Sequence, residues 1–434
     1  MNTRIAIICE DVSLLSHIDG KNATGSSVYI AELALFLSRN GFHIDIFNIC
    51  ENLESPGVVD WMPGIKVTQF NRKENVDIPG RQTVSQQQIT CLAGEIISAI
   101  RQTGVNYSLI HAFSRVPAMI AMELENALEI PFVVTLDGIT GNLNVSPEEE
   151  HREMEVMITK KAKQIIVTNI QEKEALVHLY NADQHKISII TGGYNPDEFK
   201  VVDKSLARTI LGLREEENIL LYIGQVKPSR GIDTIIQSLP LIETKQIKLI
   251  VIGGKSSIAE NDKTEEIQRL KKLAIKLGVL PRILFTGSKN RNNLKYFYSA
   301  ADIFVTTPLK GSFSLAPIEA MACGTPVIST DIGSITNAVA NGKTGFIVPS
   351  GEPAMLAQKI DLLLSDKALM HTFQKHALKR AHALFPWEQV ANMVKDLYLK
   401  MIQPKEKSTP VVPIKRSLKP HIIPGRSNGP SIAR

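Results

Sequence analysis

The sequence has few cysteines and no hydrophobic run long enough to cross a membrane. Its four cysteines, Cys9, Cys50, Cys91 and Cys323, are scattered without the spacing of a metal site or a disulfide framework. We therefore predict reduced thiols, with Cys9 and Cys323 buried, and a cytoplasmic location. No stretch of about 18 uncharged apolar residues occurs, and the apolar run at the N-terminus is short. We expect neither a transmembrane helix nor a signal peptide.

Several common catalytic patterns are also missing. No group of histidines, cysteines and carboxylates has the spacing of a metal site, so no essential metal is expected. No nucleophile elbow or serine triad pattern occurs either, which argues against a serine hydrolase.

Positive charge is concentrated at one end of the chain. The net charge is +5, but residues 403–434 hold seven basic residues against Glu406, which leaves residues 1–402 at −1. We therefore expect no nucleic-acid partner. This basic C-terminal tail is rich in Pro, Ser and Lys and is predicted to be disordered. It is either a solvated extension or an arm that contacts a membrane surface or a protein.

Short apolar strands alternate with helical stretches along all 434 residues, which predicts an α/β protein of two Rossmann-like, doubly wound domains facing across a cleft. The first domain is predicted over 1–196, and 197–206 should connect it to the second. The predicted strands are Arg4–Cys9, His43–Ile49, Ile65–Phe70, Ser108–His111, Phe132–Leu136, Gln164–Thr168, Ile187–Ile190, Ile219–Ile223, Lys248–Ile252, Ile283–Thr286, Ile303–Thr307, Val327–Ser329 and Gly345–Val348.

The stretch from Ile303 to Pro349 carries the strongest functional pattern. After its first strand, a helix should begin near Leu315, with Pro317 in the first turn and Gly324 as its stop. The free N–H groups of Ser314, Leu315 and Ala316 would then offer a site for a phosphate or diphosphate.

Glu319 lies in the first turn of this predicted helix. Its carboxylate could accept hydrogen bonds from two neighbouring hydroxyls, as on a ribose. Alternatively, it could merely complement the helix dipole.

The run FSLAPIEAMACGTPVIST, followed by GKTGFIVPSGEP, resembles the donor-site signature of the family-4 retaining glycosyltransferases, which have the GT-B fold. The segment GKNATGSSVYIAELALFLSRNGFHIDIF is similar to the sucrose-phosphate-synthase-like branch of that family. The resemblance implies that Glu319 binds the ribose of a nucleotide-diphosphate sugar. The family's other donor-site glutamate, which holds the sugar, falls on Gly311 here.

The resemblance also assigns roles to two loops that follow strands. Gly25 matches the second glycine of a pair near the donor diphosphate, and Ser288 would lie near the base. Two cationic positions that hold the leaving diphosphate fall on Gln225 and Arg230. Arg230 can stabilise the departing charge with its forked guanidinium, whereas Gln225 carries no charge. Without the resemblance, Gly25 would be a plain helix cap and Arg230 a solvated loop residue.

On the acceptor side the resemblance is weaker. Asp137 stands where the family has a histidine that touches the donor sugar, although Asp137-Gly138 could equally form a simple turn. Lys73, His111 and Arg115 match or adjoin acceptor-side positions. For Lys73 the alternative is an exposed loop lysine, and for His111 a structural hydrogen bond.

From the resemblance we expect residues 1–196 on the acceptor side, 197–385 on the donor side, a helix over 386–402 that crosses back to the first domain, and a tail over 403–434. The expected activity is retaining transfer of a sugar from a nucleotide-diphosphate donor to a hydroxyl acceptor. The changes at Asp137, Gln225 and Gly311 leave an alternative open. The chain could be a catalytically impaired scaffold or a nucleotide-sugar-binding protein.

Overall fold

The structure is a computed structural model of the full chain. It describes residues 3–10, 14, 25–51, 57–72, 85–136, 149–255, 264–309, 314–333 and 335–402. The predicted tail, 403–434, lies outside this part. The helices of the described part include none that is both long and apolar enough to span a membrane.

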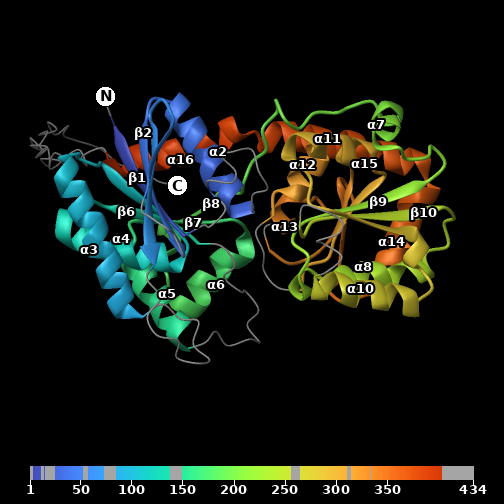
Figure 1. Ribbon diagram of the computed structural model, residues 1–434, viewed down its shortest axis with the longest axis horizontal. Helices are drawn as coiled ribbons and strands as arrows, with labels where there is room; N and C mark the ends of the chain where they lie inside the picture. The colour runs from blue at the N-terminus through green and yellow to red at the C-terminus, as the bar shows by residue number, and fades with distance from the viewer. Residues whose placement is uncertain are drawn as a thin grey trace, which may run out of the picture. The chain divides into compact units, whose positions relative to one another are not determined.

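The first sheet has eight strands in the order β3-β4-β2-β1-β5-β6-β7-β8 (Figure 1). All neighbours are parallel except β3 and β4, which form an antiparallel hairpin. Their bounds are β1 Arg4–Cys9, β2 His43–Glu51, β3 Val58–Met62, β4 Ile65–Arg72, β5 Leu109–Phe113, β6 Phe132–Thr135, β7 Gln164–Val167 and β8 Ile187–Ile189.

Strand β3 was not predicted from the sequence. Its residues alternate between exposed and half-buried, and Val58 is 59% exposed, so the strand contributes little to the core. Gly64, with φ of +84°, forms the turn into β4. An edge strand with one solvated face has only a weak hydrophobic pattern, which explains the omission.

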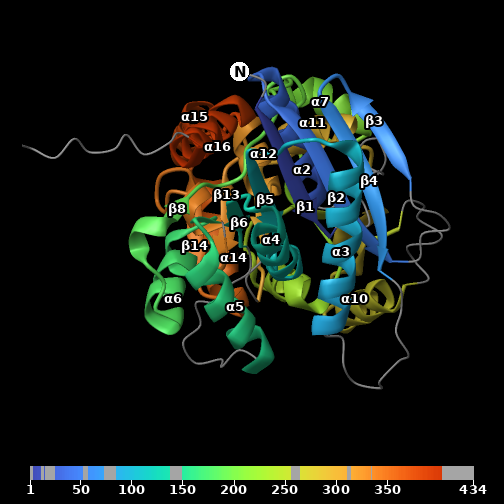
Figure 2. The same cartoon turned by 90° about the vertical axis from the view of Figure 1, so that its left-hand side faces the viewer.

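Helices cover both faces of the first sheet. One face carries α3 (Gln86–Thr103), α4 (Arg115–Leu128), α5 (Glu149–Lys161) and α6 (Ile170–Tyr180), whose apolar residues form one core cluster with the strands. The other carries α2 (Gly25–Arg39) and α16 (Trp387–Ile402), which form a second cluster. Figure 2 shows α3 and α4 crossing in front of the strands. Helix α3 was also missing from the prediction, although Ser85 and Gln88 form a capping box at its start.

The second sheet has six parallel strands in the order β11-β10-β9-β12-β13-β14. Their bounds are β9 Asn218–Ile223, β10 Ile247–Ile252, β11 Ile283–Gly287, β12 Ile303–Thr306, β13 Val327–Thr330 and β14 Gly345–Val348. All six lie within two residues of the predicted positions. Two parallel sheets with helices on both faces confirm the predicted α/β class.

Two layers of helices cover the second sheet. Helices α8 (Ile232–Ser238), α10 (Glu265–Lys276) and α14 (Pro353–Ser365) pack on one face. Helices α11 (Arg291–Ala300), α12 (Ala316–Ala322), α13 (Ile335–Ala338) and α15 (Lys367–Leu384) pack on the other. Figure 1 shows α8 and α10 on the opposite side of these strands from α11 and α12.

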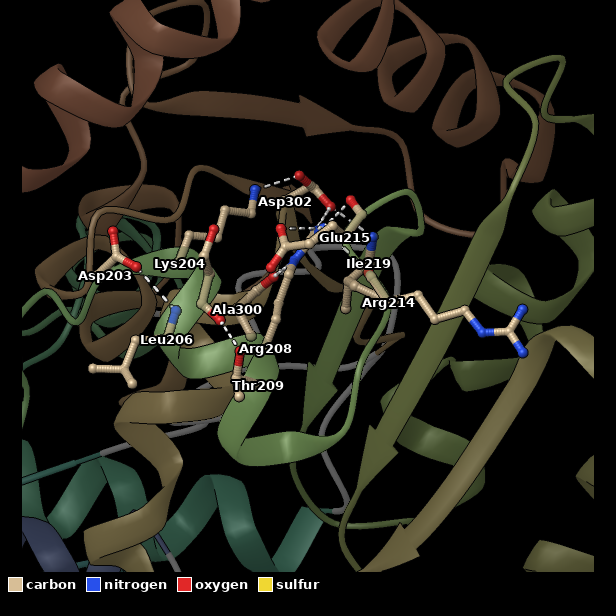
Figure 3. Close-up of polar contacts among 11 residues, drawn as sticks. Asp203, Lys204, Leu206, Arg208, Thr209, Arg214, Glu215, Ile219, Ala300 and Asp302 are labelled. Carbon is tan, nitrogen blue, oxygen red and sulfur yellow. Dashed lines mark hydrogen bonds and ion pairs between the residues drawn. The ribbon is translucent and has the colours of Figure 1, made fainter.

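A buried ion pair attaches α7 (Lys204–Leu211) to the second sheet (Figure 3). Arg208 is 3% exposed, and its Nη2 donates to Asp302 Oδ2 at 2.9 Å, just before β12. Its other nitrogens donate to backbone carbonyls, among them those of Ala300 and Glu215. Asp302 also accepts from the N–H of Ile219 at 2.6 Å. Every nitrogen of the buried guanidinium therefore has an acceptor, which a buried charge requires.

The two chain segments that pass between the sheets pair with each other. Tyr194 N donates to Phe385 O at 2.8 Å, and Trp387 N donates to Tyr194 O at 3.0 Å. A Cβ on Gly193 would lie 2.8 Å from Phe385 O, so only glycine permits this approach. After this crossing, α16 packs against α2 on the first sheet, with Trp387 and Tyr398 fully buried.

Candidate active site

The carboxyl edge of the second sheet brings several loops together. Gly231, with φ of +67°, lies against the end of β12, where an added Cβ would come within 1.8 Å of Thr307 O. Thr307 Oγ1 donates to Gly231 O at 2.7 Å, and Leu309 N donates to Ser229 O at 2.9 Å. The loop after β9 is thus fixed to the loop after β12, as expected for a ligand site at a sheet edge.

Arg230 and Gln225, both predicted to hold the leaving diphosphate, lie next to each other in this loop. Arg230 Nη2 donates to Gln225 Oε1 at 3.1 Å. The backbone carbonyl of Gln225 accepts a hydrogen bond from the hydroxyl of Tyr222 at 2.8 Å. Tyr222 is buried, and burial raises the pKa of its hydroxyl. Gln225 therefore contacts the guanidinium of Arg230 and adds no second positive charge.

The loops that follow the neighbouring strands β10 and β11 begin with small residues. A Cβ on Gly253, whose φ is +154°, would lie 1.9 Å from Gly224 O, so β9 and β10 approach closely here. Ser288, predicted to lie near the base, follows Gly287 at the end of β11, and its N–H donates to Lys255 O at 2.9 Å. This backbone N–H is already engaged within the protein.

Glu319 lies on α12, which begins at Ala316 after Leu315, as predicted. Its side chain is 4% exposed. Oε2 accepts from the Tyr298 hydroxyl at 2.8 Å, and Oε1 lies 2.8 Å from Arg291 Nη1. Oε1 has no directed hydrogen bond within the described part of the chain.

The start of α12 faces the first sheet's core. Leu315 is 4% exposed and belongs to the cluster of α2 and α16, whereas Ser314 is half-buried. Helix α12 has seven residues. That the N–H groups of Ser314, Leu315 and Ala316 hold a diphosphate stays a prediction.

One residue near Glu319 was not identified from the sequence. Glu32 of α2 is 4% exposed, and its Oε2 has no hydrogen-bond partner among the described residues. Burial, together with the charges of Glu198 and Glu319 and against that of Arg291, raises its pKa from 4.5 to about 7. The sequence does contain one signal that Glu32 is buried, because Glu32 falls on the same helix face as Tyr29 and Phe36.

His111 is fully buried in β5. Its Nδ1 lies 2.5 Å from the Tyr398 hydroxyl of α16, and its Nε2 lies 2.7 Å from Thr135 Oγ1. Burial lowers its pKa to about 3, so the imidazole is neutral. Both ring nitrogens are engaged, which fits the structural alternative better than the predicted contact with an acceptor.

Arg115, the other described acceptor-side residue, begins α4. Its Nε donates at 2.5 Å to Glu155 Oε1, and that carboxylate is buried on α5. The preceding Ser114 has φ of 80° and ψ of −179°, a conformation almost restricted to glycine. The sequence contains no signal of this backbone conformation.

Gly25 is the first residue of α2, whereas the sequence predicts it in the loop before a helix that begins at Val28. The predicted residues Asp137, Gly311 and Lys73 lie outside the described residues. Among the residues that the structure describes, no group of three or more His, Cys, Asp or Glu side chains could hold a metal ion.

Two family models match the chain. The model described as "Glycosyl transferases group 1" matches residues 203–380, and the model described as "Glycosyltransferase Family 4" matches residues 23–198. Together they cover most of both sheets.

Curated relatives match over nearly the whole chain. The D-inositol 3-phosphate glycosyltransferase of Mycobacteroides abscessus is 28% identical over 408 residues, which are 91% of this chain and 88% of that protein. D-inositol 3-phosphate glycosyltransferase 2 of Catenulispora acidiphila is 27% identical over 420 residues, 92% of this chain and 95% of that protein.

Solved structures also match over nearly the whole chain. Sucrose-phosphate synthase from Thermosynechococcus elongatus superposes with a TM-score of 0.79 at 26% identity, covering 92% of this chain and 99% of that one. Anabaena HepE, solved in complex with UDP, gives a TM-score of 0.72 at 18% identity, covering 92% of this chain and 100% of that one.

Proposed function

Because the chain belongs to the family-4 glycosyltransferases and has their GT-B fold, we propose that it transfers a sugar from a nucleotide-diphosphate sugar to a hydroxyl group, with retention of configuration. Glycosyl transfer from a donor to an acceptor follows from the family. The type of donor, the retained configuration and the type of acceptor are the proposal. One observation carries it: Arg230 lies in a loop that is fixed to the end of β12.

Arg230 stabilises the leaving group in this proposal. As the bond between the anomeric carbon and the diphosphate oxygen breaks, negative charge develops on the diphosphate. A preorganised guanidinium stabilises that charge most when its orientation is already set. The hydrogen bond from Arg230 to Gln225 sets it. The acceptor hydroxyl gives its proton to the leaving phosphate oxygen, as expected for the family.

The binding of the donor ribose falls to Glu319. A carboxylate accepts hydrogen bonds from the two neighbouring hydroxyls of a ribose. Glu319 Oε1 lies 2.8 Å from Arg291 Nη1 and has no directed hydrogen bond within the described residues, so it keeps a lone pair for a hydroxyl. The same diol gives the protein a means to prefer ribonucleotides.

The names of the relatives favour a phosphorylated acceptor. One group is named for inositol 3-phosphate, and the structural neighbour at 26% identity is a sucrose-phosphate synthase. We therefore propose a phosphorylated polyol or sugar as the acceptor, and a UDP-sugar as the first donor to try, because UDP is present in the related Anabaena structure. Reduced thiols and a cytoplasmic location belong to the same proposal, and the tail stays a candidate membrane-surface or protein contact.

The test is a transfer assay with the purified full-length protein. UDP-, ADP- and GDP-sugars are offered with a panel of phosphorylated polyols and sugars, nucleotide release is measured, and NMR of the product gives the anomeric configuration. Arg230→Gln should lower kcat by about 10²–10³-fold, the usual cost of one lost oxyanion donor. Arg214→Gln is the matched control, because Arg214 is exposed and its side chain points away from the other residues drawn in Figure 3.

Two results would count against the proposal. An inverted product would refute retention. Nucleotide binding without transfer or hydrolysis, across the whole panel, would instead support the scaffold alternative.

A further inference from the structure

Arg291 has no role in the proposed chemistry, yet it lies at the centre of a buried charge cluster. It is the first residue of α11, and its side chain is 17% exposed. Its Nε donates to Glu198 Oε2 at 2.8 Å, and its guanidinium carbon lies 4.7 Å from the centre of the Phe199 ring. Its Nη1 reaches Glu319 Oε1 at 2.8 Å. Three contacts on different sides leave the guanidinium little rotational freedom.

Glu319 is held from both of its oxygens by the same helix. Arg291 faces Oε1, and the fully buried Tyr298 donates to Oε2. An unrestrained carboxylate would lose rotational freedom on binding a diol. A carboxylate fixed in advance binds more tightly, because that entropy has already been lost.

The anchor of Arg291 comes from a different segment of the chain, which packs in the same core cluster as α11 and α12. Glu198 and Phe199 belong to the segment after Tyr194, where the two passages between the sheets pair with each other. The position of the guanidinium, and through it that of Glu319, therefore depends on this connecting segment.

We propose that Arg291, anchored by Glu198 and assisted by Tyr298, is the positioning residue that holds Glu319 in the orientation required by the ribose diol of the donor. This inference rests on the proposed function, since it assumes a ribonucleotide ligand. It predicts that discrimination between ribose and deoxyribose depends on Arg291, although Arg291 itself does not contact the sugar.

The test compares UDP with 2′,3′-dideoxy-UDP by isothermal titration calorimetry, with the ADP and GDP pairs run alongside. The wild-type protein should prefer the ribonucleotide by on the order of a hundredfold or more, the value of two hydrogen bonds to a carboxylate. Arg291→Lys keeps the charge but cannot hold Glu198 and Glu319 at once, because it lacks the rigid fork. It should lower the preference by about tenfold or more.

Two further variants keep the test decisive if Arg291→Lys unfolds. Tyr298→Phe removes only the hydroxyl that faces Oε2, and it should lower the preference several-fold. Arg269→Lys is the matched control, because Arg269 also forks between two carboxylates, those of Asp233 and Glu266, but on α10. It should leave the preference unchanged.

The outcomes separate the two proposals. Absence of binding by every nucleoside diphosphate would overturn the nucleotide-sugar donor itself. Wild-type binding without a preference for ribose would overturn the inference and the ribose contact assigned to Glu319, but not the nucleotide-diphosphate donor. In a third outcome, Arg291→Lys weakens the binding of UDP and dideoxy-UDP equally, and both Arg291→Lys and Tyr298→Phe keep the wild-type preference for UDP. This outcome would show that Arg291 is merely structural and would also overturn the inference.

Discussion

Replacing Glu32 by glutamine should make the protein more stable at alkaline pH. Glu32 is 4% exposed, and one of its oxygens has no hydrogen-bond partner among the described residues. Its pKa rises from 4.5 to about 7, first because of burial and then because of Glu198 and Glu319. Since the folded pKa exceeds the unfolded one, the native state binds more protons, and stability falls as pH rises from about 4.5 to 7.

The size of the effect follows from the shift. One pKa unit corresponds to about 1.4 kcal/mol, so ionised Glu32 should destabilise the native state by about 3 kcal/mol at pH 8. At pH 5 the carboxyl is protonated in the native state and only partly ionised in the unfolded state, so the effect has fallen to about 1 kcal/mol. Glutamine cannot ionise, so Glu32→Gln should lose about 2.5 kcal/mol less stability than wild type between pH 5 and pH 8.

Urea unfolding followed by tryptophan fluorescence suits this measurement. Trp387 is fully buried, and its ring lies 5.2 Å from that of Tyr29, one helical turn before Glu32. Glu174→Gln, at an exposed position of α6, is the control for loss of a carboxylate and should follow wild type. Parallel pH profiles of wild type and Glu32→Gln, or a Glu32→Gln protein that is less stable at pH 8, would refute the reasoning.

Three further predictions concern the loops and buried polar groups. Gly231→Ala should destabilise the protein and abolish nucleotide-dependent thermal stabilisation, because the added Cβ would meet Thr307 O. In the control Gly212→Ala, φ is also positive at +65° but nothing lies within 4 Å of the added Cβ, so the free energy of unfolding should fall by only about 1 kcal/mol. Asp302→Asn should lower the free energy of unfolding in urea by about 3–5 kcal/mol, because it leaves the buried Arg208 without its carboxylate. An effect as small as that of Lys204→Gln, which removes the more exposed cation paired with Asp302, would contradict this. Tyr398→Phe should cost about 1–3 kcal/mol by the same method, since His111 Nδ1 loses its partner, and an unchanged urea midpoint would argue against the hydrogen bond.

The sequence by itself determined the class of fold and every strand except the edge strand β3. The second-sheet strands end within two residues of their predicted positions, and α12 begins after Leu315 with Pro317 in its first turn. Cys9 and Cys323 are buried, as predicted. These features depend on local periodicity and on the φ preferences of proline and glycine, which neighbouring residues reveal.

Only the tertiary structure decided which side chains meet. Residues 32, 198, 291 and 319 form one charge cluster, although no spacing along the chain connects them. His111 is occupied by Tyr398, which lies 287 residues away, and Ser114 adopts a conformation that its residue type disfavours. Such contacts depend on how helices from different segments pack, and a hydrophobic pattern specifies the buried face of a helix but not the partner of a polar group on it.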